Sequence, residues 1–398
     1  MTDSMAAPPR RMTGLPAVFL MAAVAGVAQS FGRFAFGVVL PAIRNDLDLS
    51  NTIAGTLATV NVGAYLVGTL AVAWATGSYR LLPVMRFGFV FALAGLVLSA
   101  VAPGAVVIGI AMFCSGFGGA MIWIPAPVMA TAAVPPERRS IAVGLLGTGM
   151  GGGLVFASLL TSWVRSSFGD DDWRVVYIVL AAISAAVLAA AYAFIGHDQD
   201  QPTGNGGFGG FGALRRMRGW LPLTSAYTSF GFMYLLVMAF LATKLEDDNG
   251  WSGSEASLAF TLVGLAVAFG GPLLIGLSER IGSRRAMTTA FIGWTVIVLV
   301  ILPGWAPATL PGSFVVGLLF AGIPTTITFY VVQNTTVDDY GPSFAAATLA
   351  FGIAQMIGPQ VGGAIADLAG SFTPVFLLSA GLALTGAAAS WRLPRHDE

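Results

Sequence analysis

One charged side chain lies deep inside an apolar run near the start of the chain. Arg33 stands in the segment 29–37, whose other residues are uncharged. Its guanidinium could reach a polar surface on its long stem, bind carbonyls and polar side chains structurally, or contact an anion in a cavity. No aspartate or glutamate lies in the middle of an apolar run to pair with it. These three interpretations remain open at the level of sequence.

Other polar and aromatic side chains lie inside apolar runs, several of them at helical spacing. Gln29 is four residues from Arg33, so one helix face would carry both. Each such group could line a cavity or could instead hold neighbouring helices together. The candidate binding residues are Arg33, Gln29, Asn61, Tyr65, Trp123, Tyr227, Tyr234, Thr326, Tyr330 and Gln355.

Membrane-spanning helices must position these side chains. The 398-residue chain is 56% hydrophobic and 10% charged, whereas soluble domains carry about 25% charged residues. Helices satisfy their own backbone in lipid, so we expect an all-α protein whose surroundings are the lipid bilayer. The twelve expected spans are 16–42, 52–76, 81–102, 105–132, 140–163, 173–195, 220–243, 255–278, 286–303, 310–334, 343–366 and 373–391.

A glycine-rich basic segment divides these spans six and six. We expect an N-terminal six-helix bundle over 1–195, a cytoplasmic linker over 196–219 and a C-terminal six-helix bundle over 220–398. Weak internal matches, such as Phe31-Gly32 with Phe230-Gly231, predict that the bundles are pseudo-symmetric. Repeats of this kind place a binding cavity at the bilayer midplane, and rocking of the halves gives alternating access.

The basic residues predict how the chain lies in the membrane. With the N-terminus inside, fourteen arginines fall in cytoplasmic segments and four basic residues in outer loops, and Arg33 completes the 19 Lys and Arg. This bias predicts a multi-pass protein of the cell inner (plasma) membrane with both termini cytoplasmic. The cluster Arg215, Arg216 and Arg218 suits anionic lipid, and we expect no nucleic-acid partner.

Glycine and proline inside the spans predict local features of the helices. Glycines cluster at 144–153 and 352–363, where they would allow close helix packing or form faces along which the halves slide. Pro127 and Pro324 lie in equivalent spans of the two halves. They predict paired kinks, which would suit either a bending gate or simple curvature.

The segment 276–285 reads Gly-Leu-Ser-Glu-Arg-Ile-Gly-Ser-Arg-Arg. It resembles the cytoplasmic signature of the major facilitator superfamily, roughly G-x-L-x-D-R-x-G-R-R, with Glu279 in the acidic place. The first glycine is displaced by one position, and Ser283 replaces one arginine. Segments 358–363 and 136–139 are also similar to features of this family. The sequence Gly32-Arg33-Phe34 resembles an uncharacterised bacterial subgroup of it, and the likeness covers nearly the whole chain.

This resemblance implies a cytoplasmic gate in which an acid meets the positive start of a helix in the other half. Glu279 would face the start of the fifth span, although these charges could also be solvated loop residues. At the matching place in the first half Thr76 stands where the acid belongs, so that contact is expected to be missing or replaced. The predicted gate residues are Glu279, Arg280, Gly282, Arg284, Arg138 and Arg139.

The resemblance further implies a secondary transporter of a small organic solute, and Arg33 favours an anion. The alternatives are a multidrug or metabolite exporter of the same fold and a transporter-like membrane sensor that moves nothing. No enzyme motif stands in a suitable context, because the glycine pattern at 147–152 lies inside an apolar helix. We therefore expect a monomer with a small-molecule substrate, without catalytic residues, metal or cofactor.

Overall fold

The computed structural model describes residues 12–75, 80–196 and 210–394. Within these ranges it has twelve helices long and apolar enough to cross a membrane, which confirms the expected number. Thr76 and the expected linker residues 197–209 lie outside the described residues. The spans are Leu15–Asp46, Asn51–Ala75, Leu81–Ala100, Ala105–Ala132, Pro136–Ser167, Asp170–Phe194, Trp220–Asp247, Gly253–Ile281, Ser283–Ile301, Ala306–Asn334, Pro342–Ala369 and Thr373–Trp391.

The helices of the first six spans include several short or irregular pieces. The first span alone consists of three segments in an unbroken rod. In chain order the helices are α1 (Leu15–Gly26), η1 (Val27–Phe34), α2 (Ala35–Asp46), α3 (Asn51–Ala75), α4 (Leu81–Ala100), α5 (Ala105–Trp123), α6 (Ala126–Ala132), η2 (Pro136–Arg138), α7 (Arg139–Ser167), η3 (Asp170–Asp172) and α8 (Trp173–Phe194).

The second six spans are longer and more regular. They follow a short helix, α9, that lies within the expected linker. In chain order the helices are α9 (Gly210–Arg216), α10 (Trp220–Asp247), α11 (Gly253–Ile281), α12 (Ser283–Ile301), α13 (Ala306–Asn334), α14 (Val337–Ala369) and α15 (Thr373–Trp391).

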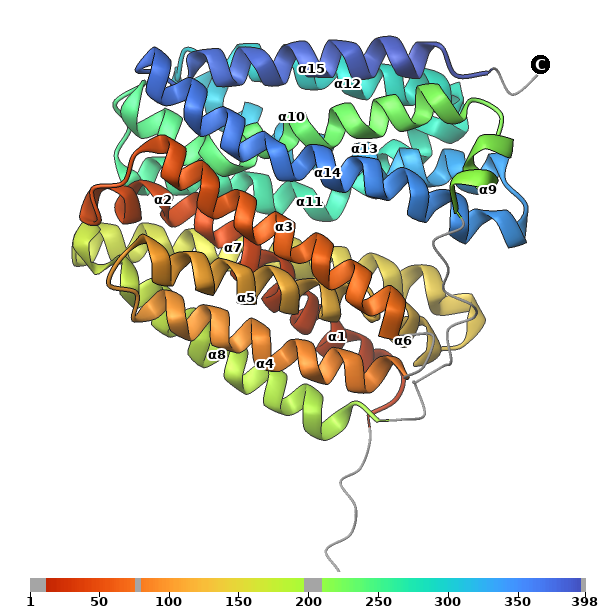
Figure 1. The fold of residues 1–398 in the computed structure, drawn as a ribbon, viewed down its shortest axis with the longest axis horizontal. Coiled ribbons are helices and arrows are strands. Elements are labelled where there is room, and N and C mark those ends of the chain that lie inside the picture. The colour runs from red at the N-terminus through yellow and green to blue at the C-terminus, as the bar shows by residue number, and fades with distance from the viewer. Residues whose placement is uncertain (1–11, 76–79, 197–209, 395–398) are drawn as a thin grey trace, which may run out of the picture.

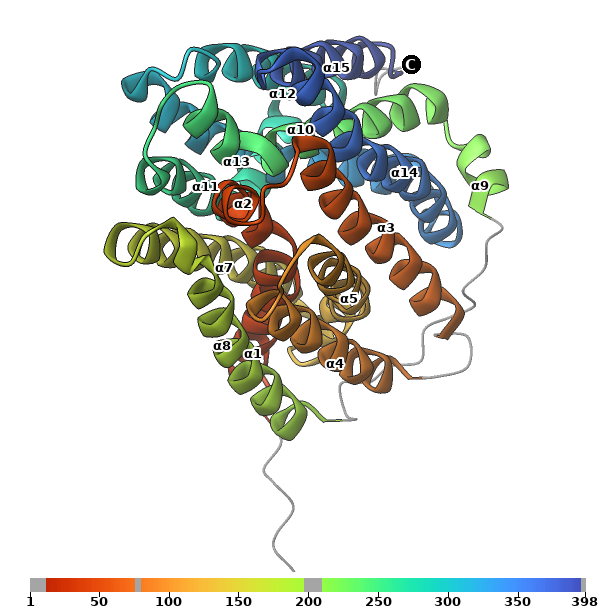
Figure 2. The same ribbon diagram turned by 60° about the vertical axis from the view of Figure 1, so that its left-hand side comes forward.

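The helices form two layers, with α1–α8 below and α10–α15 above in Figure 1. Two helix pairs join the layers, α3 with α14 and α7 with α11, and α2 also packs on α10. Figure 2 shows α3 beside α14 from a second direction. Arrangements of this kind are typical of carriers whose halves move against each other about a central site.

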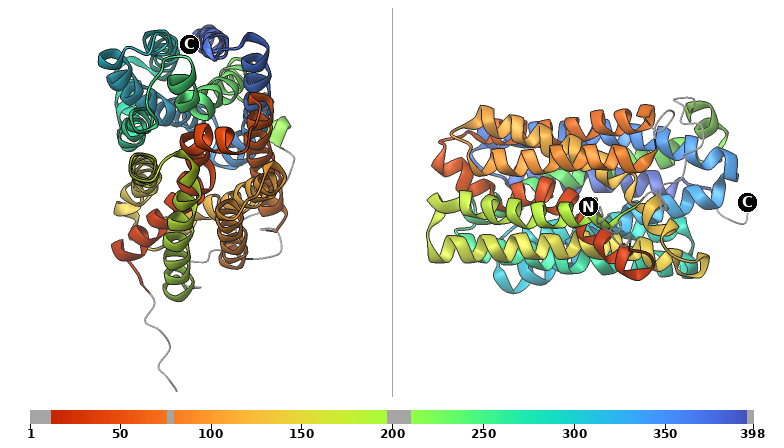
Figure 3. Two further views of the ribbon diagram at one scale, coloured as in Figure 1. Left: turned by 90° about the vertical axis from the view of Figure 1, so that its left-hand side faces the viewer. Right: turned by 90° about the horizontal axis from the view of Figure 1, so that it is seen from below.

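The ends of the helices define two sides of the molecule. The terminal side is the one where Met12 donates a backbone hydrogen bond to the Phe194 carbonyl at the end of α8. The distal side is the opposite one, with the connections 47–50, 168–172, 248–252 and 370–372. Figure 3 shows the long helices running side by side between them.

Two helices of the second layer begin at well-formed caps on the distal side. Ser252 and Glu255 form a capping box at the start of α11, which satisfies two free backbone donors. Asp248 accepts hydrogen bonds from the Phe372 and Thr373 N–H groups at the start of α15. Burial raises the pKa of Asp248, but hydrogen bonds from Ser371 and the Phe372 N–H, together with the Lys244 charge, hold it below the ordinary value.

The clustered glycines divide between two kinds of contact. In α7, Gly149 lies against the Ala22 carbonyl of α1, so this contact is packing within one layer. Gly151 instead faces Gly264 of α11 across the layers, and Gly55 of α3 faces Pro359 of α14. The small residues thus allow close packing both within one layer and between the two layers.

The prolines do not produce a matched pair of breaks. The fourth span is interrupted between Trp123 and Ala126, where Pro125 begins the short helix α6. The tenth span contains Pro324 but continues as one helix, α13. The helix is therefore interrupted beside Pro125, whereas Pro127 lies inside α6 and Pro324 inside α13. Neighbouring groups can restore backbone bonding around a proline in a bundle.

Replacing Gly149 by alanine is expected to destabilise the protein, because the new Cβ would overlap the Ala22 carbonyl. Overpacking of this kind costs about 1–3 kcal/mol. Gly152→Ala, in the same helix, is the matched control, since nothing lies within 4 Å of its Cβ position. Thermal unfolding in detergent should show a lower midpoint for Gly149→Ala alone. Equal midpoints for the two variants would contradict the close packing of α1 on α7.

Candidate functional site

Arg33 sits in a π-helical segment, η1 (Val27–Phe34), between two ordinary α-helical stretches. A π-helix carries wider turns than an α-helix and is frequent at functional sites. The Asn61 side chain of α3 holds this segment, because its Nδ2 donates to the Gly32 carbonyl at 3.0 Å and to the Met112 carbonyl at 3.0 Å. The Ser30 hydroxyl also donates to the Met150 carbonyl of α7. Helices α3, α5 and α7 therefore fix the backbone from which Arg33 projects.

The guanidinium of Arg33 reaches across to the other layer. Its Nη2 donates to the Tyr234 hydroxyl of α10 at 2.9 Å and to Gln355 Oε1 of α14 at 2.9 Å. The Tyr234 hydroxyl in turn donates to Gln355 Oε1 at 2.7 Å. Tyr234 and Gln355 are each only 3% exposed. We call Arg33, Tyr234 and Gln355 the central triad, since these three residues join the two halves between the layers.

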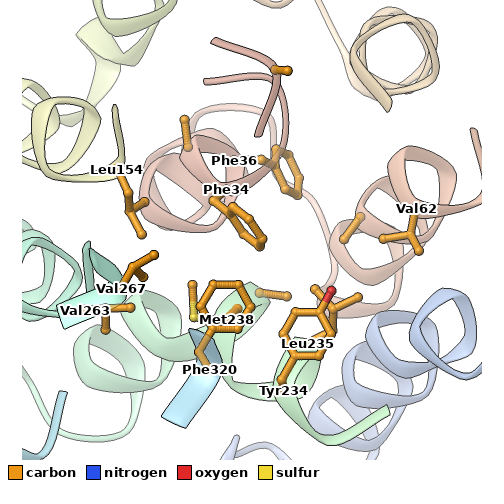
Figure 4. Packing of buried hydrophobic residues seen from close by; sticks show 14 of the residues in the cluster. Phe34, Phe36, Val62, Leu154, Tyr234, Leu235, Met238, Val263, Val267 and Phe320 are labelled. Atoms are coloured by element: carbon orange, nitrogen blue, oxygen red, sulfur yellow. The ribbon is translucent and has the colours of Figure 1, made fainter. Parts of the chain in front are cut away.

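Aromatic rings surround the triad. The Arg33 Cζ lies 4.9 Å from the centre of the Tyr65 ring and 5.4 Å from that of Phe34, distances at which a cation is attracted by a ring. Phe34 packs edge-on against Phe320 of α13 at 5.4 Å, and Tyr234 lies 5.3 Å from the same ring. Figure 4 shows Phe34, Phe320 and Tyr234 meeting between the two layers.

The charge of Arg33 has no carboxylate partner among the described residues. Its hydrogen-bond acceptors are a neutral phenol and a neutral amide. Its Nε is buried without a hydrogen bond, as is Asn61 Oδ1. Both residues border a cavity of about 20 Å³ that Phe36, Leu235 and Met238 also line. An uncompensated cation with a free N–H donor is an arrangement that a bound anion would complete, whereas the Asn61 oxygen would need a donor.

Three more of the predicted binding residues lie close to this arrangement. Tyr65 covers the guanidinium, and the Gln29 side chain hydrogen-bonds Tyr65. Asn61 borders the small cavity, but its amide is engaged by backbone carbonyls of its own half. The structure thus gathers six of the ten candidates around one point: Arg33, Gln29, Asn61, Tyr65, Tyr234 and Gln355.

The remaining four candidates lie elsewhere. Thr326 bonds to the Gly322 carbonyl of its own helix, and the Tyr330 hydroxyl donates to the Arg218 carbonyl on the terminal side. Tyr227 stacks on Phe351 with ring centres 4.4 Å apart. Trp123 is half-buried against the apolar core at the end of α5. The contacts described here for these four residues are with groups outside the central triad.

The predicted gate residues lie on the terminal side, where the structure leaves them apart. Glu279, Arg280, Arg138 and Arg139 are exposed, and no ion pair joins the first two to the others within the described ranges. Instead, Glu279, Gly282 and Arg284 border a cavity of about 460 Å³ together with Tyr330 and Trp391. The Arg284 guanidinium lies 4.5 Å from the Trp391 ring centre.

Ion pairs and charged hydrogen bonds instead close the distal side, which sequence reasoning missed. Arg165 of α7 donates from Nη1 and Nη2 to both oxygens of Glu246 in α10, at 2.6 and 2.7 Å. Arg44 at the end of α2 pairs with Asp247, with Nη2 to Oδ1 at 2.8 Å. Both pairs join the two layers. Predicting them would have required knowing which loops meet in space.

A carboxylate at the end of α14 completes this closure. Asp367 accepts the backbone N–H groups of Asn51 and Thr52, at 2.9 and 2.8 Å, and also the Thr52 hydroxyl. These donors are the free amides at the start of α3, where an anion is also favoured by the helix dipole. The distal side is therefore held shut by charges, and the terminal side lacks a corresponding ion pair between the layers among the described residues.

Twelve spans in two layers around a central, partly polar site are typical of a membrane transporter. A family model described as "Uncharacterised MFS-type transporter YbfB" matches residues 25–390. The chain therefore belongs to the major facilitator superfamily, in the uncharacterised YbfB-like group, as the resemblance implied.

Individual relatives are distant but cover most of the chain. AraJ of Escherichia coli is 23% identical, with 88% of each chain covered. The cis,cis-muconate transport protein of Acinetobacter baylyi is 23% identical over 87% of this chain and 85% of that protein. Among solved structures, a bacterial homologue of the human lysosomal transporter Spinster, in an inward-facing and unoccupied conformation, has a TM-score of 0.72 at 16% identity, covering 95% of both chains.

Replacing Asp367 by asparagine is expected to loosen the distal closure, because a neutral amide accepts the α3 amides less strongly than a carboxylate. Thr59→Cys on α3, in a Cys114→Ala background, reports the opening, since the Thr59 hydroxyl now bonds to the Met356 carbonyl across the layers. A membrane-impermeant maleimide should label this cysteine several-fold faster in Asp367→Asn. Asp171→Asn, at an exposed acid of the same side, is the control. Unchanged labelling in Asp367→Asn would contradict a closing role.

Proposed function

We propose that this transporter carries a small organic anion across the cell membrane by alternating access, with Arg33 as the anion contact. The observation that carries the proposal is the half-buried guanidinium, whose hydrogen-bond acceptors are all neutral among the described residues. An arginine at a helix centre costs about 2.5–3.5 kcal/mol on insertion scales, and such residues generally mark a substrate pathway. The name of the muconate transport protein, a relative by sequence, supports the carboxylate group as the feature of the cargo that is recognised. Muconate itself carries two carboxylates, so this relative does not bear on the number of charges.

The central triad suggests how the empty site is kept stable. Without substrate, Tyr234 and Gln355 supply the acceptors that Arg33 needs. A carboxylate would form a charged, bidentate pair with the guanidinium and replace these weaker neutral contacts. Gln29 and Tyr65 would then hold the guanidinium on its other face. Substrate would thereby exchange one set of contacts between the halves for another.

We further propose the orientation and the moving parts. The positive-inside rule supports a cytoplasmic terminal side, so the distal side would face outward. Residues 1–195 and 220–398 would rock as two units joined by the linker 196–219. The closed distal side corresponds to an inward-facing state, the state named for the Spinster homologue. When the carrier turns outward, Glu279 would approach the start of α7 near Arg138 and Arg139.

The proposal is tested by thermal stabilisation of the purified protein with three solutes of one shape: benzoate, benzamide and benzylamine. Benzoate alone should stabilise the wild type. Arg33→Gln should lose at least tenfold in apparent affinity, since a charged hydrogen bond contributes about 1.5–3 kcal/mol. Arg33→Lys should bind more weakly than wild type, because a point charge cannot form the bidentate pair.

Gln355→Glu gives the sharper test. The new side chain is nearly the same size as glutamine and supplies Arg33 with a negative charge from within the protein. This variant should fold and yet lose benzoate stabilisation. Arg392→Gln, which removes an exposed arginine near the end of α15, is the control for loss of charge alone. If benzylamine or benzamide stabilised wild type and Arg33→Gln equally, Arg33 would be structural and the anion proposal would fail.

A further inference from the structure

We propose that the central site selects monoanions with an apolar body and discriminates against dianions and polyhydroxylated anions. This inference rests on the proposed anion carrier and names the substrate class of the same site. It follows from two features of the surroundings of Arg33: the number of charges available there, and the chemistry of the walls.

One positive charge is available to a substrate in the central site. Arg165 meets Glu246 and Asp170. Lys244 lies 3.2 Å from Asp248, and the other paired cations, Arg44 and Arg174, meet Asp247 and Asp46 at distal span ends. Arg86, six residues into α4, donates to the Tyr192 and Ile195 carbonyls at the terminal side. Across the described part of the spans, Arg33 is the one cation near the middle of a span. A second negative charge on the substrate would therefore be buried without a partner, which is strongly unfavourable.

The geometry of the guanidinium also fits one carboxylate. Both hydrogen bonds of the triad use Nη2, whereas Nε is buried without an acceptor. A carboxylate that binds across Nε and Nη2 would satisfy the free donor and displace Tyr234 or Gln355 from the other. The carboxylate would thus occupy the free Nε edge of Arg33, which is the only cation of the site.

The walls of the site are apolar and aromatic. Tyr65 and Phe34 present their rings to the guanidinium, and Phe320 packs against Phe34. Phe36, Leu235 and Met238 border the adjoining cavity, and Figure 4 shows their side chains between the layers. The polar groups near the guanidinium are engaged with one another, apart from the free Asn61 Oδ1. The several hydroxyl groups of a sugar acid would therefore outnumber their free partners and would lose their water. An aliphatic or aromatic body would instead gain from burial.

The experiment uses the full-length protein in nanodiscs and probes matched in shape: benzoate with terephthalate, hexanoate with adipate, and gluconate as a hydroxylated monoanion. At pH 7.5, half-maximal thermal stabilisation by benzoate and hexanoate should need at least tenfold less solute than the other three. Near pH 4.5 the gap between hexanoate and adipate should narrow, because one adipate carboxyl then becomes protonated.

A variant that adds charge tests the same inference by gain of function. Gln355→Lys places a second cation beside Arg33 and should improve adipate at least tenfold relative to hexanoate. Size-exclusion chromatography checks that the variant folds, and if it does not, the wild-type comparison decides. The inference would be overturned if dianions stabilised the wild type at the same concentrations as monoanions. It would also be overturned if Gln355→Lys folded but showed no improvement for adipate relative to hexanoate. In either case, loss of benzoate binding in Arg33→Gln would still support the proposed anion carrier. Failure of every anion to stabilise the wild type would overturn both.

Discussion

The charge of Arg33 is the constraint around which the rest of the molecule is organised. A guanidinium far from water needs acceptors, and this chain supplies them from the opposite layer through Tyr234 and Gln355. The contact is therefore a hydrogen-bonded joint between the two layers, which would have to separate if the halves rock as proposed. Because both acceptors are neutral, the joint is weaker than an ion pair and can be exchanged for a stronger partner.

The distal closure follows a different physical principle. There the halves meet through complementary charges, with Arg165 held by Glu246 and Asp170 and with Asp367 seated on the start of α3. These contacts lie at the ends of spans, so opening of the distal side would expose each partner to water. The layers thus meet through ion pairs at the span ends and through neutral hydrogen bonds at the centre. Each kind of contact keeps the free energy needed to separate the layers low.

Much of the fold could be predicted from the sequence, because hydropathy over some twenty residues reports directly on a bilayer span. The isolation of Arg33 from any mid-span carboxylate was also visible, since it needed only a list of charged positions. The choice of partners was not visible. Tyr234 and Thr326 were equally good candidates by spacing, yet only Tyr234 turns toward Arg33. The difference lies in the rotation of each helix about its own axis, which weakly amphipathic spans do not encode locally.

Two other features escaped prediction for related reasons. The ion pairs Arg165–Glu246 and Arg44–Asp247 join residues about 81 and 203 positions apart, and no local pattern marks such a match. The π-helical form of 27–34 also has no compositional signature, because it arises from contacts made by its neighbours, including Asn61 on the Gly32 carbonyl.

That π-helical segment also determines how far the two ends of the first span are rotated about the helix axis relative to each other. A π turn accommodates one residue more than an α turn, so residues after Phe34 are rotated relative to those before Val27 by comparison with an uninterrupted helix. Removing one residue between them would convert the segment to α-helix and turn one end by about 100° against the other. Either α1 would lose its face against α7, or Arg33 would swing away from α10 and α14. The length of this segment, counted in single residues, is therefore as much a determinant of the site as the side chains themselves.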